Sequence, residues 1–307
     1  MTVQLEDPPT PVPRAPARRR PWTPGRWRTT ALLVGPAVVV LAGVFIAALL
    51  VLAEFSLHRF RGGVTEPGYT VAEWTEFLTT SFVWDLVAET VVLGLITTAI
   101  CAVVGYSTAL ALQRVTSRTM RTACYFAIFS PLLTSVVSRT YGWSLILGDV
   151  GFVNSVAGHL NLPGAPYIMM YERTAVVVAL VHILLPFMVL PIVSSLRQID
   201  TELPLASSDL GASGWATFRK VVFPLSLPGL IAGAQLTFAL TISAFATPSL
   251  LGGGRVQVLA TNIYGDVQTL NWPRASVGAF LLLALALLSL AVFSLLQRRL
   301  LARGGAG

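Results

Sequence analysis

The segment that decides the fold is IDTELPLASSDLGASGWATFRKVVFPLSLPGL, from Ile199 to Leu230. It is mostly polar and lies between two long apolar stretches of the chain. Its pattern predicts a short helix over Leu205 to Leu210 that ends at Gly211, where glycine allows a positive φ angle. A second helix is expected from Gly214 to Val222. Such a helix–turn–helix indicates a loop at a membrane surface, which either docks a partner or packs beneath the membrane helices.

The composition places the remaining chain in a lipid bilayer. Of the 307 residues, 54% are hydrophobic and only 11% are charged, and the mean hydropathy is +0.73. A transmembrane helix needs about 20 mainly apolar residues. The chain is therefore expected to be an all-α integral membrane protein with six transmembrane helices: Thr30–Ala53, Leu86–Leu112, Ala123–Leu147, Thr174–Leu196, Val222–Leu251 and Ala275–Leu296.

The distribution of basic residues predicts the orientation, because Lys and Arg near helix ends stay in the cytoplasm. With the N-terminus inside, 15 of the 21 basic residues fall on cytoplasmic segments, five fall outside, and Arg139 lies within the membrane. Both termini and the loop 197–221 are therefore expected in the cytoplasm. The same bias explains the net charge of +7 without a nucleic-acid partner.

The expected organisation is one transmembrane domain, 30–300, between two tails. Residues 1–29 are rich in Pro and Arg and predict a disordered cytoplasmic tail. The apolar run after it is too long for a cleaved signal peptide and indicates an anchor helix. An outer loop is expected over 54–85, and residues 301–307 form a C-terminal tail.

Motifs for catalysis are absent from the sequence. A Walker A loop requires Gly-Lys before Ser or Thr, whereas the one lysine, Lys220, follows Arg219 and precedes Val221. There is no His-Glu-x-x-His zinc motif and no Gly-x-Ser-x-Gly elbow. We therefore expect a noncatalytic chain that holds no cofactor and no metal.

Several motifs carry a family resemblance. The stretch Leu205–Ser213 (LASSDLGAS), followed by Phe223–Leu225 (FPL) and Pro228-Gly229, resembles the EAA loop of ABC importer permeases. The other matching motifs are Arg139–Trp143 (RTYGW), Leu185–Pro191 (LPFMVLP), Thr247–Gly254 (TPSLLGGG) and Asn271–Pro273 (NWP). Over about residues 86–296 the chain resembles the first permease subunit of spermidine/putrescine-type importers.

The resemblance implies a division of labour among subunits. It implies the type I importer fold, with a coupling helix between helices four and five, in the cytoplasmic membrane of a bacterium. Two permease subunits would form the pathway, two ATPase subunits would bind ATP and Mg²⁺, and an extracytoplasmic protein would deliver substrate. The residues that match the ATPase-coupling loop are Leu205, Ala206, Ser207, Asp209 and Gly211. Two depart from the motif, because the family has Glu where Leu205 stands and Ala where Ser207 stands.

Six further residues are candidates for lining or gating the pathway: Arg139, Tyr141, Trp143, Glu89, Phe245 and Thr247. A charge inside the membrane is costly and usually faces the interior or a partner. Helical rise places Arg139 and Glu89 at similar depths. They are therefore expected to pair, either in the pathway or as a purely structural contact.

The resemblance favours a polyamine as the cargo. Oxidised iron, sulfate and phosphonate are alternatives, because related permeases share these motifs. An unrelated six-helix membrane enzyme or channel is the alternative outside the family.

Overall fold

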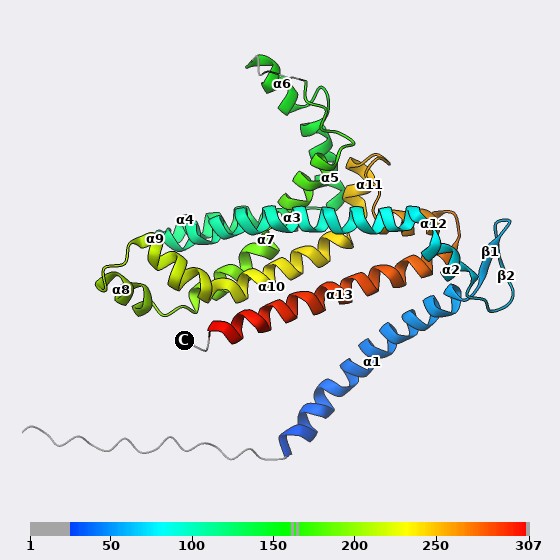
Figure 1. The fold of residues 1–307 in the computed structure, drawn as a ribbon, viewed down its shortest axis with the longest axis horizontal. Coiled ribbons are helices and arrows are strands. Elements are labelled where there is room, and N and C mark those ends of the chain that lie inside the picture. Colours follow the sequence, from blue (N-terminus) through cyan, green and yellow to red (C-terminus); the bar gives the residue numbers. More distant parts are fainter. Residues whose placement is uncertain (1–24, 161–162, 164–165, 305–307) are drawn as a thin grey trace, which may run out of the picture. The chain divides into compact units, whose positions relative to one another are not determined.

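The computed structural model describes residues 25–160, 163 and 166–304. Helices make up nearly all of its regular structure (Figure 1). The elements are α1 (Gly25–Ser56), β1 (Arg59–Arg61), β2 (Val64–Glu66), α2 (Ala72–Thr79), α3 (Ser81–Arg114), α4 (Arg118–Phe129), the 3₁₀ turn η1 (Ser130–Leu133), α5 (Val136–Leu147), α6 (Phe152–His159), α7 (Arg173–Arg197), α8 (Glu202–Asp209), α9 (Gly214–Thr217), the π-helix η2 (Phe218–Val222), α10 (Phe223–Ile242), α11 (Ala246–Leu251), α12 (Leu259–Gln268) and α13 (Trp272–Gly304).

The chain divides into two units, residues 1–51 and 52–307. The described part of the first unit, residues 25–51, lies in helix α1, whose stretch Val34–Ser56 is long and apolar enough to cross a membrane. A helix that is apolar all round suits a membrane span. Of the predicted disordered tail, residues 1–24 lie outside the described residues, and Gly25 onward is helical.

The core of the second unit is formed by α3, α7 and α10, which pack against one another. Two glycines one helical turn apart, Gly229 and Gly233, let α10 approach α7 closely. A Cβ at Gly229 would overlap the carbonyl oxygen of Pro191, and one at Gly233 would lie 2.9 Å from Sδ of Met188. Small residues at this spacing bring membrane helices into backbone contact. The close packing of α10 on α7 therefore depends on these two glycines.

The number of membrane spans agrees with six when one broken helix counts as a single span. Within the described residues, five helices are long and apolar enough to cross a membrane. The sixth is the pair Arg118–Leu133 and Val136–His159, which is bent by 103°. The third span predicted over 123–147 is therefore present, but as a broken helix. Pro131 opens a 3₁₀ turn at the break, where it has no helical hydrogen bond to lose.

The fifth predicted helix, 222–251, is also interrupted. Helix α10 ends at Ile242, and α11 begins at Ala246. Pro248 lies in the first turn of α11, where a missing N–H is tolerated. The short helix α11 therefore replaces the last part of the expected span, and α12 follows it in the chain.

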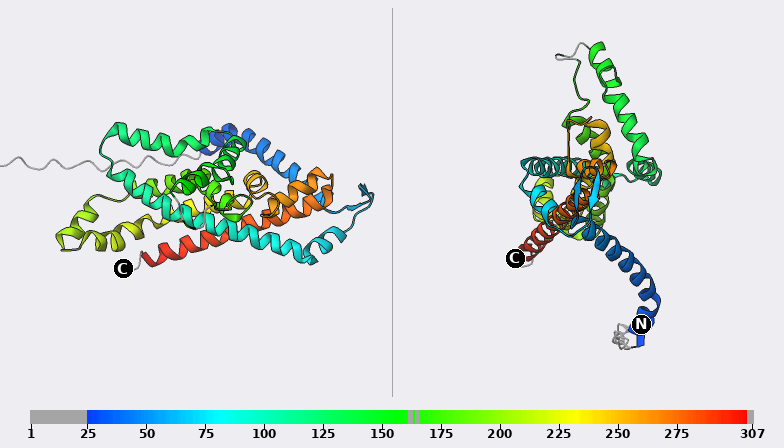
Figure 2. Two further views of the ribbon diagram at one scale, coloured as in Figure 1. Left: turned by 90° about the horizontal axis from the view of Figure 1, so that it is seen from above. Right: turned by 90° about the vertical axis from the view of Figure 1, so that its right-hand side faces the viewer.

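The two ends of the bundle carry different elements. Helices α8 and α9, the start of α4 and the end of α13 lie at one end, while α2, the β1–β2 hairpin and α12 lie at the other (Figure 1). The antiparallel hairpin, α2 and the start of α3 occupy the predicted outer loop, 54–85. The segment of α5 and α6 projects from the side of the bundle (Figure 1 and Figure 2, right).

Candidate functional site

The candidate coupling loop, predicted over residues 197–221, contains helix α8 and turns at Gly211. Gly211 has a φ angle of +82°, as the sequence predicts. The turn closes the helix with two backbone hydrogen bonds, Gly211 N–H to Ser208 O (2.9 Å) and Ala212 N–H to Ser207 O (3.1 Å). This is the Schellman arrangement, which favours glycine at the left-handed position. The turn is thus specified by one residue and its backbone.

The second arm of the loop starts at Ser213, whose hydroxyl accepts a hydrogen bond from Ala216 N–H at 3.3 Å. The predicted helix 214–222 is divided into α9 and the π-helix η2. The hydroxyls of Ser207 and Thr217 lie 3.0 Å apart and join the two arms. Ser207 stands where the family loop has Ala, so this link is a consequence of the departure that the sequence shows.

Three large apolar side chains of the loop are exposed. The exposed fractions are 63% for Leu205, 89% for Leu210 and 70% for Trp215, and Ala206 and Asp209 are exposed beside them. Large apolar side chains clustered at a loop tip mark a protein interaction surface. Four of the five predicted coupling residues thus lie on an open face, and the fifth, Ser207, ties the loop together.

An aromatic cluster connects the loop to the bundle. Tyr106 of α3 lies edge-on to Phe218 of η2 and Phe223 of α10, at centroid distances of 5.9 and 5.7 Å. Its hydroxyl is 2.6 Å from Oγ of buried Ser226. Trp215 stacks on Phe218 from the loop side. The loop is therefore in direct contact with α3 and α10.

The sequence analysis did not single out Tyr106 and Ser226. A signal was present, because a tyrosine hydroxyl inside an apolar helix requires a polar partner. Ser226 lies within the motif region that carries the family resemblance, yet sequence alone does not show which residues meet across helices.

The predicted Arg139–Glu89 pair is not formed. Glu89 instead accepts two hydrogen bonds from Arg173, Nε to Oε1 at 2.8 Å and Nη2 to Oε2 at 2.5 Å. Arg139 donates from Nη1 to the carbonyl oxygen of Pro131. The arginine thus stabilises the break between η1 and α5, while Arg173, the first residue of α7, takes the carboxylate.

The other candidate pathway residues lie on neighbouring elements. Tyr141 is exposed on α5, and Nε1 of Trp143 lies 3.3 Å from Nδ1 of His182 on α7. Phe245 stacks on Tyr264 at 5.0 Å. Thr247 is buried at the start of α11, which packs against α5. The structure therefore brings the 139–143 and 245–247 segments close together.

A polar cavity of about 420 Å³ lies between α11 and α12 and includes Asp266 in its lining. Burial raises the pKa of the Asp266 carboxyl to about 6, and nearby Glu73 raises it further, while Arg274 opposes the shift. Nε of Arg274 lies 3.9 Å from Oδ2 of Asp266.

Comparisons with known proteins identify the class. Residues 101–304 match the family described as "binding-protein-dependent transport system inner membrane component". The chain is 32% identical over 233 residues to the spermidine/putrescine transport system permease protein PotB of Escherichia coli K12, covering 75% of this chain and 83% of that protein. Identity to PotB of Haemophilus influenzae is 31% over 249 residues, 79% of this chain and 85% of the relative.

The fold agrees with that class. A bacterial alginate ABC transporter, solved in complex with alginate pentasaccharide-bound periplasmic protein, contains a chain that superimposes with a TM-score of 0.74. That match covers 90% of this chain and 95% of the other at 15% identity. The chain belongs to the family of inner-membrane components of binding-protein-dependent transport systems. It is a multi-pass, noncatalytic permease subunit of an ABC importer.

Proposed function

We propose that this permease carries a polyamine, spermidine or putrescine, and that α8 is the element on which an ATPase subunit acts. The cargo assignment rests on the relatives named for spermidine/putrescine transport, of which this chain covers more than four fifths. The lever assignment rests on the contacts of the loop with the bundle.

A lever must be stiff, exposed at one end and packed at the other. The Schellman turn and the Ser207–Thr217 hydrogen bond stiffen the loop. Leu205 and Leu210 are exposed at its tip. Phe218 meets Tyr106 at its base. A displacement of α8 would therefore shift α10 against α3, which is how a rigid element drives alternating access.

The complete importer in this proposal contains a second permease subunit, two ATPase subunits that bind ATP and Mg²⁺, and an extracytoplasmic binding protein. The chain lies in the cytoplasmic membrane of a bacterium with both termini and the coupling loop in the cytoplasm. The excess of basic residues on those segments supports this orientation. The proposed pathway-lining or gating residues are Arg139, Tyr141, Trp143, Phe245 and Thr247. Glu89, which is paired with Arg173, is the sixth.

The grip on the ATPase depends mainly on apolar contact. The family loop has Glu at the position of Leu205, whose side chain is 63% exposed here. Burying such a leucine against a partner contributes about 1.5–3 kcal/mol. Asp209 is exposed on the same helix and supplies a carboxylate in place of the missing one.

The cargo is tested by uptake of radiolabelled spermidine and putrescine in cells that lack their own polyamine importers and express this chain with its partner subunits. We expect saturable uptake that disappears when the Walker A lysine of the partner ATPase is replaced. Absence of labelled polyamine uptake, together with ATP-dependent uptake of labelled sulfate, phosphonate or ferric iron by the same cells, would assign a different cargo to the same permease.

The coupling face is tested by two substitutions at one position. Leu205→Arg should lose most uptake, because a cation replaces a buried apolar contact. Leu205→Glu introduces the residue of the family loop but loses the apolar contact, so it should reduce uptake less than Leu205→Arg does. Membrane abundance, measured by immunoblot, should be equal in both because the side chain is exposed. Parental uptake in the Arg variant would remove Leu205 from the docking face.

A further inference from the structure

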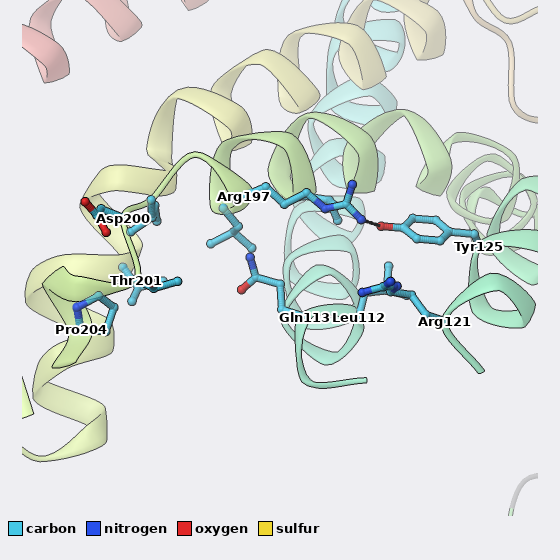
Figure 3. Close-up of a pocket in the computed structure, with 12 residues that line it drawn as sticks. Leu112, Gln113, Arg121, Tyr125, Arg197, Asp200, Thr201 and Pro204 are labelled. Atoms are coloured by element: carbon cyan, nitrogen blue, oxygen red, sulfur yellow. Dashed lines mark hydrogen bonds between the residues drawn. The ribbon is translucent and has the colours of Figure 1, made fainter. Parts of the chain in front are cut away.

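A cavity of about 390 Å³ lies where the coupling loop leaves helix α7 (Figure 3). Its walls come from the end of α3, from α4, from the end of α7 and from the start of the loop. It is separate from the pathway candidates and from the exposed tip of α8. Its polar lining includes two guanidinium groups, Arg121 and Arg197.

The two arginines lie at the same end of the cavity and neither is neutralised by a carboxylate. Among the residues that the structure describes, neither forms an ion pair. The one acidic residue in the lining, Asp200, lies at the opposite end with its oxygens turned away (Figure 3). Its Oδ1 accepts a hydrogen bond from Glu202 N–H at 3.0 Å. The carboxylate is therefore engaged in starting α8, and the cationic end is left without a counter-ion.

Arg197 is held in position. Its Nη2 donates to the hydroxyl of Tyr125 at 2.6 Å, and its guanidinium carbon lies 5.8 Å from the centre of the Tyr125 ring. Tyr125 follows Arg121 by four residues on α4, so both side chains face α7. This geometry orients donors toward the cavity before any ligand arrives, and a planar guanidinium suits the oxygens of phosphate.

The floor of the cavity is apolar. It includes Leu112, Val193, Leu196 and Val222. A cationic rim above an apolar floor, at the end of a transmembrane bundle, matches an amphiphile with an anionic head. Basic residues beside transmembrane helices attract anionic lipid headgroups in the same way. A cationic cargo would be repelled here, so the cavity is not a cargo site.

We propose that this cavity binds a phosphate-bearing anion between Arg121 and Arg197, next to the root of the coupling loop. The phosphate belongs to an anionic phospholipid or is free inorganic phosphate, and both would be held by the same two guanidiniums. Binding would connect α4 to α7 beside Thr201 and Pro204, which also line the cavity. The ligand would thus brace the base of the lever.

The experiment measures binding to the full chain in two arms. In the first, the chain in nanodiscs of phosphatidylcholine and phosphatidylglycerol is transferred to detergent, and retained lipid is counted by native mass spectrometry. In the second, equilibrium dialysis measures binding of labelled inorganic phosphate. R121Q and R197Q should each reduce retention about tenfold, because a charged hydrogen bond contributes about that factor. R118Q changes an arginine of α4 outside the cavity and is the matched control.

A second variant separates binding from folding. Gln113 lines the cavity from an exposed position at the end of α3, so Gln113→Trp should fill the space while both arginines remain. If R121Q, R197Q and Q113W lose retained lipid, the phosphate belongs to a lipid. If they lose only the binding of inorganic phosphate measured by dialysis, the ligand is free phosphate. If neither ligand binds the parent, or if folded R197Q and Q113W bind as the parent does, the proposal is wrong.

Discussion

The turn at Gly211 should control coupling through its backbone conformation. An ideal Cβ at this position meets no atom of the chain within 4 Å, so substitution causes no clash inside the subunit. The cost comes from the φ angle of +82°. A non-glycine residue in the left-handed region costs about 1–2 kcal/mol, and Asn tolerates it better than Ala. Such a cost lowers the population of the correct turn roughly 5- to 30-fold.

We therefore expect Gly211→Ala to lose most uptake and Gly211→Asn to keep more of it, although Asn is larger. The assay is ATP-dependent polyamine uptake in cells, normalised to the amount of chain in the membrane. Both variants should insert normally, because the bundle core of α3, α7 and α10 is untouched. Parental uptake in the Ala variant would refute the role of the turn. Lower uptake in Asn than in Ala would show that side-chain size on the docking face decides coupling.

Three further predictions concern the bundle and its outer end. Tyr106→Phe removes the hydrogen bond to Ser226 and should cost about 1 kcal/mol of stability, seen as a lower melting temperature, and should raise the ATP hydrolysed per polyamine imported. Glu89→Arg combined with Arg173→Glu should recover uptake that each single change reduces, and no recovery would exclude the pair. The Asp266 carboxyl has its pKa raised from 3.8 to about 6 in the folded chain. The free energy of unfolding should therefore fall as pH rises through that range, by about 3 kcal/mol at most. Thermal melting in detergent should show this pH dependence for the parent and not for Asp266→Asn.

The sequence predicted the coupling turn well because the turn is local. Gly211 has a positive φ angle, and Ser213, two residues later, caps the N-terminus of α9. Both features depend on neighbours within four residues, which a sequence displays directly. The same holds for the apolar spans around α3, α7 and α13, where composition alone is sufficient.

The incorrect predictions concern direction in space. Pro131 indicates an interruption within 123–147, but a local sequence signal does not give the bend of 103° after Leu133. Arg139 and Glu89 lie at similar depths in the membrane by helical rise, which predicts a pair. Depth does not determine which face of its helix a side chain occupies. Arg173 directly precedes the expected span Thr174–Leu196. It is the first residue of α7, and its guanidinium reaches the carboxylate.

The two ends of the bundle differ in charge in a way that suits a cationic cargo. Away from the coupling loop, a cavity of about 550 Å³ includes Asp85, Glu89 and Glu172 in its lining, against two arginines. Ion pairs use Glu89 and Glu172, so Asp85 leaves this cavity with a net negative charge. The cavity beside the loop has the opposite sign. A polyamine would be attracted at the first end and repelled at the second, and a phosphate bound there would weaken that repulsion. The proposed anion would therefore lower the positive charge at the loop end of the bundle and also stiffen the lever.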